Sequence, residues 1–198
     1  MPPKPKFSKD EIIAAALDIV REKGIDALTA RELGARLGSS ARPIFTVFAS
    51  MDEVAQAVRE EAQRQYDAHV RKASDQTDVP AFKAAGQLML SYAKQQPKLF
   101  SLLFMHECES AHDFADVFAS LGDTAPLSID FIRRDYGLTE DAAMSLFKQL
   151  WVFTYGLSVL CATGMCVFSD EELSQMLTEQ FTASIKSIKA AENAEKGK

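Results

Sequence analysis

The stretch TARELGARLGSSARPIFTVF, residues 29–48, decides the fold of this chain. Thr29 is a favourable N-cap residue, and Glu32 three residues later completes the pattern of a capping box, so a helix is predicted to begin here. Leu33 and Leu37 lie on the side of that helix that would be buried. Gly38 follows in the position where a residue with positive φ ends a helix. We therefore expect a short helix followed by a tight turn.

The second half of the stretch predicts another short helix. Ser39 and Ser40 can cap it, while Ile44 and Phe48 are spaced i, i+4 and would form its inner face. Gly34, in the preceding helix, is small enough to let a neighbouring helix come close. Two capped helices around a glycine-containing turn are typical of the helix-turn-helix, whose second helix enters the DNA major groove.

A third helix is expected before this stretch. Ser8 and Glu11 form another capping-box pattern, apolar residues follow at helical spacing, and Gly24 ends the run. Three helices in about 50 residues can bury one small core. We therefore assign residues 1–49 to a helix-turn-helix DNA-binding domain.

The remaining residues, 50–198, are predicted to form a larger helical domain that binds an effector and dimerises. Residues 50–73 form a linking helix, and further helical patterns begin near 79, 97, 114 and 126. The last two helices begin after Thr139 and Ser169, and the first of them is apolar on nearly all sides, which is typical of a buried helix. No strand pattern or glycine-rich phosphate loop occurs in the sequence. The predicted fold class is all-α, with about nine helices.

Charge is divided unevenly along the chain. The net charge is −6, yet residues 1–50 hold eight basic and six acidic residues, which leaves −8 for the rest. A mildly basic head on an acidic body fits a local contact with nucleic acid. No apolar run reaches the roughly 18 residues of a membrane span, and the N-terminus MPPKPKF does not resemble a secretory signal. We therefore expect a cytoplasmic protein with reduced cysteines.

The quoted stretch, together with the following SMDEV at residues 50–54, resembles the tetracycline-repressor (TetR) family of bacterial transcriptional regulators. The resemblance is strong over about residues 1–55 and only architectural beyond. It implies a homodimer through the last two helices, at about 139–166 and 169–190. It also implies a ligand-responsive repressor that binds a two-fold DNA operator and is released by a small, mainly apolar effector.

Carried over to this sequence, the resemblance implies that Thr29 and Arg31 contact phosphates and that residues 40–46 form the recognition helix. Its outward side chains would be Ser40, Ala41, Arg42, Pro43, Phe45 and Thr46. Arg42 is the only long donor among them, so we expect it to read a guanine through two hydrogen bonds, with a phosphate contact as the alternative. Pro43 is tolerable because a first-turn N–H has no partner within the helix.

Two positions depart from the family pattern, and a basic arm precedes the first helix. Phe45 and Met51 stand where many members have Tyr and Lys, so two polar contacts are lost and a shallower salt dependence is expected. Lys4 and Lys6, spaced by prolines, form an arm that is either a solvated tail or a contact to phosphates or the minor groove.

An effector site in the larger domain is implied by the resemblance, and no cofactor is expected. The candidate lining residues are aromatic, Met and His side chains of the middle helices, with core packing as the alternative. They are Phe100, Phe104, Met105, His106, Phe147, Trp151 and Tyr155. Thr154 is a further polar group that could orient a ligand.

Other function classes have weaker support in the sequence. Cys108 and His112 are spaced i, i+4 and could hold a metal, but no second pair completes the site. Redox sensing could use Cys108 alone or Cys161 and Cys166 as a pair, with burial as small apolar side chains as the alternative. The three histidines offer no recognisable catalytic set, so we do not expect an enzyme. A redox or metal sensor without an organic effector, and a helical dimeric interaction module, stay open as alternatives.

Overall fold

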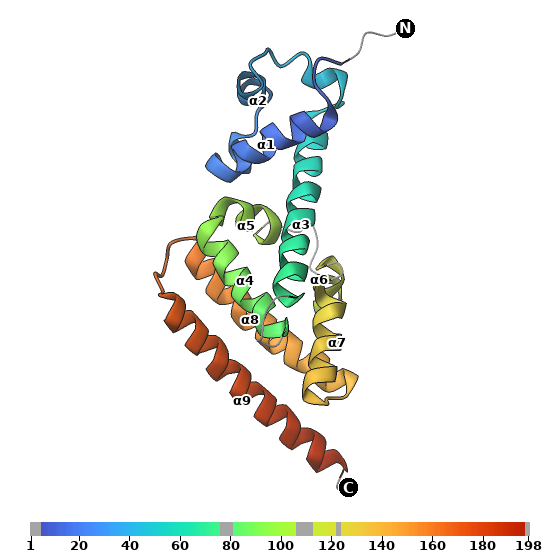
Figure 1. Ribbon diagram of the computed structural model, residues 1–198, viewed down its shortest axis with the longest axis vertical. Coiled ribbons are helices and arrows are strands. Elements are labelled where there is room, and N and C mark those ends of the chain that lie inside the picture. The colour runs from blue at the N-terminus through green and yellow to red at the C-terminus, as the bar shows by residue number, and fades with distance from the viewer. Residues whose placement is uncertain (1–4, 76–80, 106–112, 122–123, 197–198) are drawn as a thin grey trace. The chain divides into compact units, whose positions relative to one another are not determined.

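The computed structural model describes residues 5–75, 81–105, 113–121 and 124–196, and all regular structure in these ranges is helical (Figure 1). The described ranges contain nine α-helices, α1–α9, and two short 3-10 helices, η1 and η2, with no strand. The predicted all-α fold class is confirmed. Among the described helices, none combines the length and the apolar character needed to cross a membrane.

The chain divides into two compact units. Unit 1 comprises Met1–Tyr66 and Gln96–Glu107, and unit 2 comprises Asp67–Gln95 and Cys108–Lys198. Helix α3, Met51–Asp75, begins in the first unit and ends in the second. Unit 1 thus contains the predicted DNA-binding segment 1–49, the first part of the linking helix and one later helix.

Unit 1 is built from short helices whose starts follow local capping chemistry. Its elements are α1 (Lys9–Lys23), η1 (Ile25–Ala27), α2 (Ala30–Arg36), η2 (Ile44–Thr46), the start of α3 and α5 (Pro97–Phe104). The predicted capping box of α1 is confirmed, because Ser8 Oγ accepts from the Glu11 N–H at 3.2 Å and the Ser8 N–H donates to the Glu11 carboxylate at 2.7 Å. Each box satisfies two N–H groups that a helix start leaves open.

The core of unit 1 joins α1 to the elements that follow it. Helix α1 packs against η1, α2 and α5. Ile12, Ile19, Leu33, Ile44 and Val58 are fully buried and come from α1, α2, η2 and α3. Burial of such aliphatic side chains is the main favourable contribution to this small fold.

Unit 2 is arranged around α8. Its helices are α4 (Ala81–Gln95), α6 (Phe114–Ser120), α7 (Thr124–Tyr136), α8 (Glu140–Ala162) and α9 (Asp170–Lys196). Helix α8 packs against α4, α7 and α9, and the long α9 runs beside it in Figure 1. The predicted caps of the last two helices are confirmed, because Thr139 accepts from the Ala142 N–H and Ser169 forms a capping box with Glu172. Gly137, with φ +65°, follows the last residue of α7 and donates its N–H to the Arg133 carbonyl.

Two buried clusters hold unit 2 together. The larger one joins α7, α8 and the end of α9, through side chains such as Ile132, Leu146 and Ile188. The smaller one joins α4, α8 and the start of α9 through Leu90, Leu157, Leu173 and Leu177. The strongly apolar α8 is therefore covered on several sides, as its sequence predicts.

Candidate nucleic-acid interface

Helix α2 begins where the sequence predicts, but with half of the expected capping box. Thr29 Oγ1 accepts from the Glu32 N–H at 3.2 Å. The returning bond is absent, because the Thr29 N–H donates to the Ala27 carbonyl at 3.0 Å and the Glu32 carboxylate pairs with Lys23 Nζ at 2.6 Å. The predicted complete box is therefore wrong, since η1 already satisfies the donor that Glu32 would have taken.

The turn after α2 depends on two glycines. Gly38 has φ +63°, the left-handed conformation that the sequence predicts. Gly34 is buried, and a Cβ placed on it would lie 2.9 Å from the carbonyl carbon of Ser40 and from the nitrogen of Ala41. The backbone of the recognition segment, residues 40–46, thus lies directly against α2, and only glycine permits this approach.

The recognition segment is less regular than expected. Within it only Ile44–Thr46 forms a helix, the 3-10 helix η2, and hydrogen bonds from residue i+3 back to residue i connect Ala41 to Ile44 and Pro43 to Thr46. Seven residues with an internal proline leave few N–H groups for α-helical bonds, and the tighter 3-10 turn is typical of such short pieces. The predicted regular helix and its serine caps are wrong here, because the N-cap of η2 is Pro43 and no side chain caps it.

The predicted inner face of the recognition segment is confirmed, and the predicted outer face is confirmed except at Ala41 and Pro43. Ile44 is fully buried and Phe48 is 2% exposed, so both pack inward. Outside, Phe45 is 47% exposed, a high value for an aromatic side chain. Ser40, Arg42 and Thr46 are also exposed, whereas Ala41 and Pro43 are half-buried.

Thr46 has a narrower role than its exposure suggests. Its hydroxyl donates to the Pro43 carbonyl at 2.7 Å. The hydroxyl hydrogen is therefore occupied, and only the oxygen lone pairs remain to accept a hydrogen bond. A phosphate oxygen needs a donor, so Thr46 in this conformation suits contact with a donor group or an apolar one.

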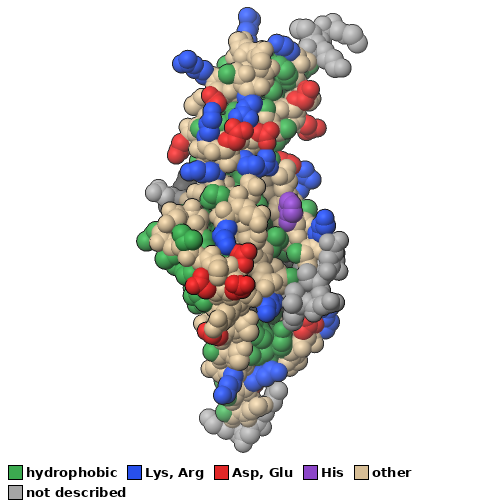
Figure 2. All heavy atoms as spheres, turned by 60° about the vertical axis from the view of Figure 1, so that its left-hand side comes forward, with side chains coloured by type: hydrophobic (Ala, Val, Ile, Leu, Met, Phe, Trp, Pro, Cys, Tyr) green, Lys and Arg blue, Asp and Glu red, His purple; other side chains and the backbone are tan. Residues whose placement is uncertain are grey.

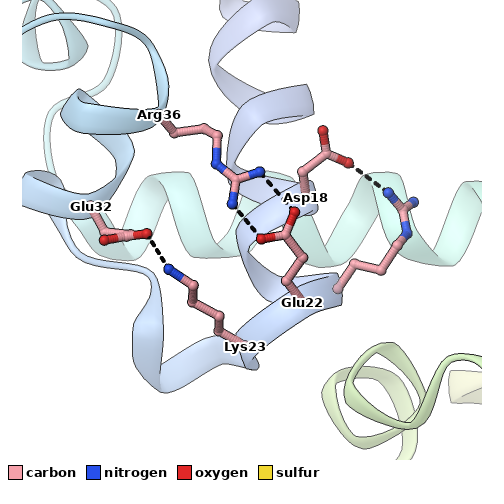
Figure 3. Close-up of polar contacts among 6 residues, drawn as sticks. Asp18, Glu22, Lys23, Glu32 and Arg36 are labelled. Atoms are coloured by element: carbon pink, nitrogen blue, oxygen red, sulfur yellow. Dashed lines mark hydrogen bonds and ion pairs between the residues drawn. The ribbon is translucent and has the colours of Figure 1, made fainter.

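Two ion pairs fix α2 against the end of α1 (Figure 3). The Arg36 guanidinium donates to both carboxylate oxygens of Glu22, at 2.9 Å and 2.5 Å, and Lys23 Nζ donates to Glu32 at 2.6 Å. The Arg36 and Lys23 hydrogen bonds hold the pKa values of Glu22 and Glu32 below their ordinary value of 4.5. Because all four side chains are paired, this surface adds little net positive charge.

Arg31 and Arg42 differ from the other arginines of the head. Arg21 pairs with Asp18 at 2.6 Å and Arg36 with Glu22, whereas Arg31 and Arg42 are exposed and have no hydrogen-bond or ion-pair partner among the described residues. Figure 2 shows basic side chains protruding at the upper end of unit 1, above a band where basic and acidic side chains alternate. Among the described arginines of the head, those without a partner therefore lie at the start of α2 and in the recognition segment.

The basic arm contacts the turn of the helix-turn-helix. Lys6 Nζ donates to Ser39 Oγ at 3.0 Å, which brings an N-terminal cation next to the recognition segment. Lys9 Nζ lies 5.4 Å from the centre of the Phe48 ring. The sequence gives no signal for the Lys6–Ser39 contact because the two residues are 33 positions apart. Lys4 lies outside the described residues.

The candidate effector residues fall into two groups. In unit 1, Phe100 and Phe104 have ring centres 5.0 Å apart, and Met105 is half-buried. In unit 2, Trp151 stacks on Tyr155 with ring centres 5.1 Å apart, and Phe147 packs edge-on against another aromatic ring. His106 lies outside the described residues.

The candidate metal and redox residues are only partly visible. Cys108 and His112 lie outside the described residues, and the described ones contain no group of three side chains that could hold a metal ion. Cys161 and Cys166 are free thiols. Burial raises the pKa of the Cys161 thiol, which lowers its reactive thiolate fraction at neutral pH.

Comparison with protein families identifies the N-terminal part of the chain. Residues 12–58 match the model of bacterial regulatory proteins of the tetR family. This range contains most of α1, all of α2 and the recognition segment, and ends in α3. No curated protein matches the sequence significantly.

Solved structures of similar fold cover nearly the whole chain. A putative TetR-family transcriptional regulator from Vibrio parahaemolyticus is 14% identical with a TM-score of 0.57, over 88% of this chain and 96% of that one. A TetR-like regulator from Rhodococcus sp. RHA1 is 14% identical with a TM-score of 0.59, over 90% and 95%. The fatty acid degradation regulator FadR from Bacillus halodurans is 13% identical with a TM-score of 0.58, over 92% and 97%. At these identities the likeness concerns the fold.

Proposed function

Because the chain belongs to the TetR family of bacterial transcriptional regulators, we propose that it binds duplex DNA through the recognition segment and the start of α2. The observation that carries this proposal is the pairing of the head arginines. Arg21 and Arg36 are ion-paired, while Arg31 and Arg42 are exposed and have no partner within the described part of the chain. Unpaired cations on the segment expected to meet DNA are available for phosphates and base edges.

Each exposed side chain suits a different contact. Arg42 can donate two parallel hydrogen bonds to guanine O6 and N7 in the major groove. Phe45 beside it offers an apolar surface for a thymine methyl group. Arg31 and Thr29, at the N-terminus of α2, are placed for phosphates, which helix N-termini favour. Lys6, held at Ser39, adds a cation from the arm.

We further propose that the protein is a homodimeric repressor that assembles through α8 and α9. The outer side of α8 exposes 53% of Val152, and no atom lies within 4 Å of a Cβ built on the nearby Gly156. An apolar side chain beside a glycine suits close contact with another helix. A two-fold dimer places its heads on half-sites about 34 Å apart, and a small effector that favours another head spacing releases the DNA.

Fluorescence anisotropy with the full chain tests the DNA-binding proposal. The probes are a duplex from upstream of its own gene and a scrambled duplex of the same composition. Arg42→Ala should weaken binding to the native duplex by about 10- to 100-fold and relax the preference for it. Arg31→Ala should weaken binding to both duplexes alike and reduce the salt slope by about 0.9 per head. Arg21→Ala, which removes a paired arginine of the same unit, is the matched control and should change affinity little.

Two results would contradict the proposal. Equal affinity of the wild type for native and scrambled duplexes at moderate salt would favour a dimeric interaction module over a specific regulator. Equal losses in the Arg42→Ala and Arg21→Ala variants would show that pairing within the head does not decide which arginines meet DNA.

A further inference from the structure

Unit 2 contains a cavity that none of the candidate aromatic residues lines. It has a volume of about 330 Å³ and lies among α4, α7, α8 and α9, with Gly86, Tyr136, Thr154, Leu177 and Phe181 in its wall. A cavity of about 150 Å³ accommodates benzene, so this one has room for roughly a dozen non-hydrogen atoms. By contrast, the half-buried rings of Trp151 and Tyr155 stack on each other and do not line this cavity.

The absence of a side chain at Gly86 widens this cavity, and neither the backbone conformation nor a close neighbour requires glycine there. It lies inside α4, where glycine is unfavourable. It has no positive φ, and a Cβ built on it would lie 3.8 Å from Leu177 Cδ1 and from Thr154 Oγ1, which is ordinary contact distance. Unlike Gly34, it is not required by a close backbone. The effect of the missing side chain is open space between α4, α8 and α9.

Two side chains of the cavity, Lys83 and Tyr136, can donate hydrogen bonds to a ligand, whereas the hydroxyls of Thr178 and Thr182 already donate to backbone carbonyls of α9. Lys83 Nζ donates to Thr178 Oγ1 at 3.2 Å and has two further hydrogens to offer. No acidic side chain lines the cavity, and Lys83 has no carboxylate partner among the described residues. Burial raises the pKa of Tyr136, whose hydroxyl therefore stays protonated and can donate as well. The remaining wall is mainly apolar.

A second lysine of α4, Lys94, has the carboxylate partner that Lys83 lacks within the described residues. Lys94, three turns further along the helix, lines a neighbouring cavity of about 250 Å³ and forms an ion pair with Asp170 of α9. Lys83 has no such acid opposite it on α9, where Thr178 stands. The two ends of the α4–α9 contact thus differ in charge, and the Lys83 end is the one open to an anion.

We propose that this cavity binds an amphipathic carboxylate with an apolar body of about ten carbons. The carboxylate accepts hydrogen bonds from Lys83 Nζ and the Tyr136 hydroxyl, and the apolar body lies along Gly86, Leu177 and Phe181. Charge-assisted hydrogen bonds of this kind are about twice as strong as neutral ones, so the charge selects the ligand class. The inference names the effector chemistry of the proposed regulator, and it rests on that function only for the step from ligand binding to DNA release.

Calorimetric titration of the full chain at pH 7 with decanoate and with 1-decanol, both below the concentrations at which they aggregate, tests this inference. The wild type should bind decanoate at least tenfold more tightly than decanol. Lys83→Met should weaken decanoate binding by about tenfold or more and leave decanol binding unchanged, whereas Lys83→Arg should restore most of the affinity. Lys94→Met, on the same helix but already paired, is the matched control and should bind decanoate as the wild type does. Gly86→Leu should fill the cavity and abolish binding of both probes.

Thermal unfolding of every variant separates loss of binding from loss of fold. If Gly86→Leu does not fold, Gly86→Ala replaces it, because its methyl group fits and should weaken decanoate several-fold. The inference is overturned if decanoate does not bind, if Lys83→Met and Lys94→Met have equal effects, or if the Gly86 variants bind like the wild type. DNA binding by the ligand-free protein is measured separately, so failure of the DNA proposal and failure of this one are distinguishable.

Discussion

Replacing Gly34 with alanine should destabilise the helix-turn-helix, although alanine is the better helix former. In the interior of a helix, Gly→Ala is worth about 1 kcal/mol in favour of alanine. Here the new Cβ would lie 2.9 Å from two backbone atoms of Ser40 and Ala41 and 3.1 Å from the Ser39 carbonyl oxygen. These are backbone atoms, so no flexible side chain can move aside. Overpacking of this kind costs about 1–3 kcal/mol, and we expect a net loss of about 1 kcal/mol.

The same substitution at Gly86 is the matched control. Both glycines lie inside helices, but the nearest atoms to a Cβ at Gly86 are 3.8 Å away. Because no steric clash opposes the higher helix propensity of alanine there, Gly86→Ala should stabilise the protein by about 0.5–1 kcal/mol. The two variants should therefore shift stability in opposite directions, although the chemical change is identical.

Thermal unfolding and DNA binding together provide the assay. For a chain of this length, 1 kcal/mol shifts Tm by about 2–4 °C, so Gly34→Ala should lower the Tm of unit 1 by that amount. At a temperature where the variant is still folded, its DNA affinity should also fall, because the displaced backbone carries the recognition segment. A Gly34→Ala variant as stable as Gly86→Ala, with unchanged DNA affinity, would refute the close approach of the turn to α2.

Three further predictions concern caps, pH and assembly. Ser8→Ala removes the confirmed capping box and should cost about 1 kcal/mol in urea unfolding; an unchanged midpoint would contradict this. Glu22 and Glu32 have pKa values lowered below 4.5, so their stabilising effect is present above that pH and lost as pH falls. The wild type should therefore lose more stability between about pH 5 and pH 3 than the Glu22→Gln, Glu32→Gln double variant; parallel losses would argue against the pairs. Val152→Glu should convert the proposed dimer to monomer in sedimentation, and an unaffected dimer would exclude this face of α8.

The sequence was sufficient for helix positions because capping is local chemistry. Ser8, Thr29, Thr139 and Ser169 each accept a backbone N–H within three residues, and the structure confirms all four as N-caps. It was insufficient for residues 40–46. Capping signals there suggested a regular helix, but a segment so short, with an internal proline, forms only 3-10 turns.

The charged residues of the site could be counted from the sequence, but the ion pairs that they form with one another could not be predicted. Lys23 and Glu32 are nine positions apart and Arg36 and Glu22 fourteen, so neither pair follows the i, i+4 rule that makes helical ion pairs readable. The cavity of unit 2 was missed for a similar reason. Its polar donors come from α4 and α7 and its apolar wall from α8 and α9, and only tertiary packing brings them together.

Under the proposed function, ion pairing within the head decides which of its cations are available to DNA. An arginine in a bidentate pair with a glutamate must break two hydrogen bonds before it can bind a phosphate. A paired arginine is therefore less available to DNA than an unpaired one, although both carry the same charge. Arg36 and Lys23 hold α1 and α2 together. Gly34 lies in α2 between these pairs and lets the recognition segment lie against the helix. In the proposed function, the paired charges therefore serve orientation and the unpaired Arg31 and Arg42 serve recognition, so a net charge of −6 for the whole chain is compatible with a head that binds DNA.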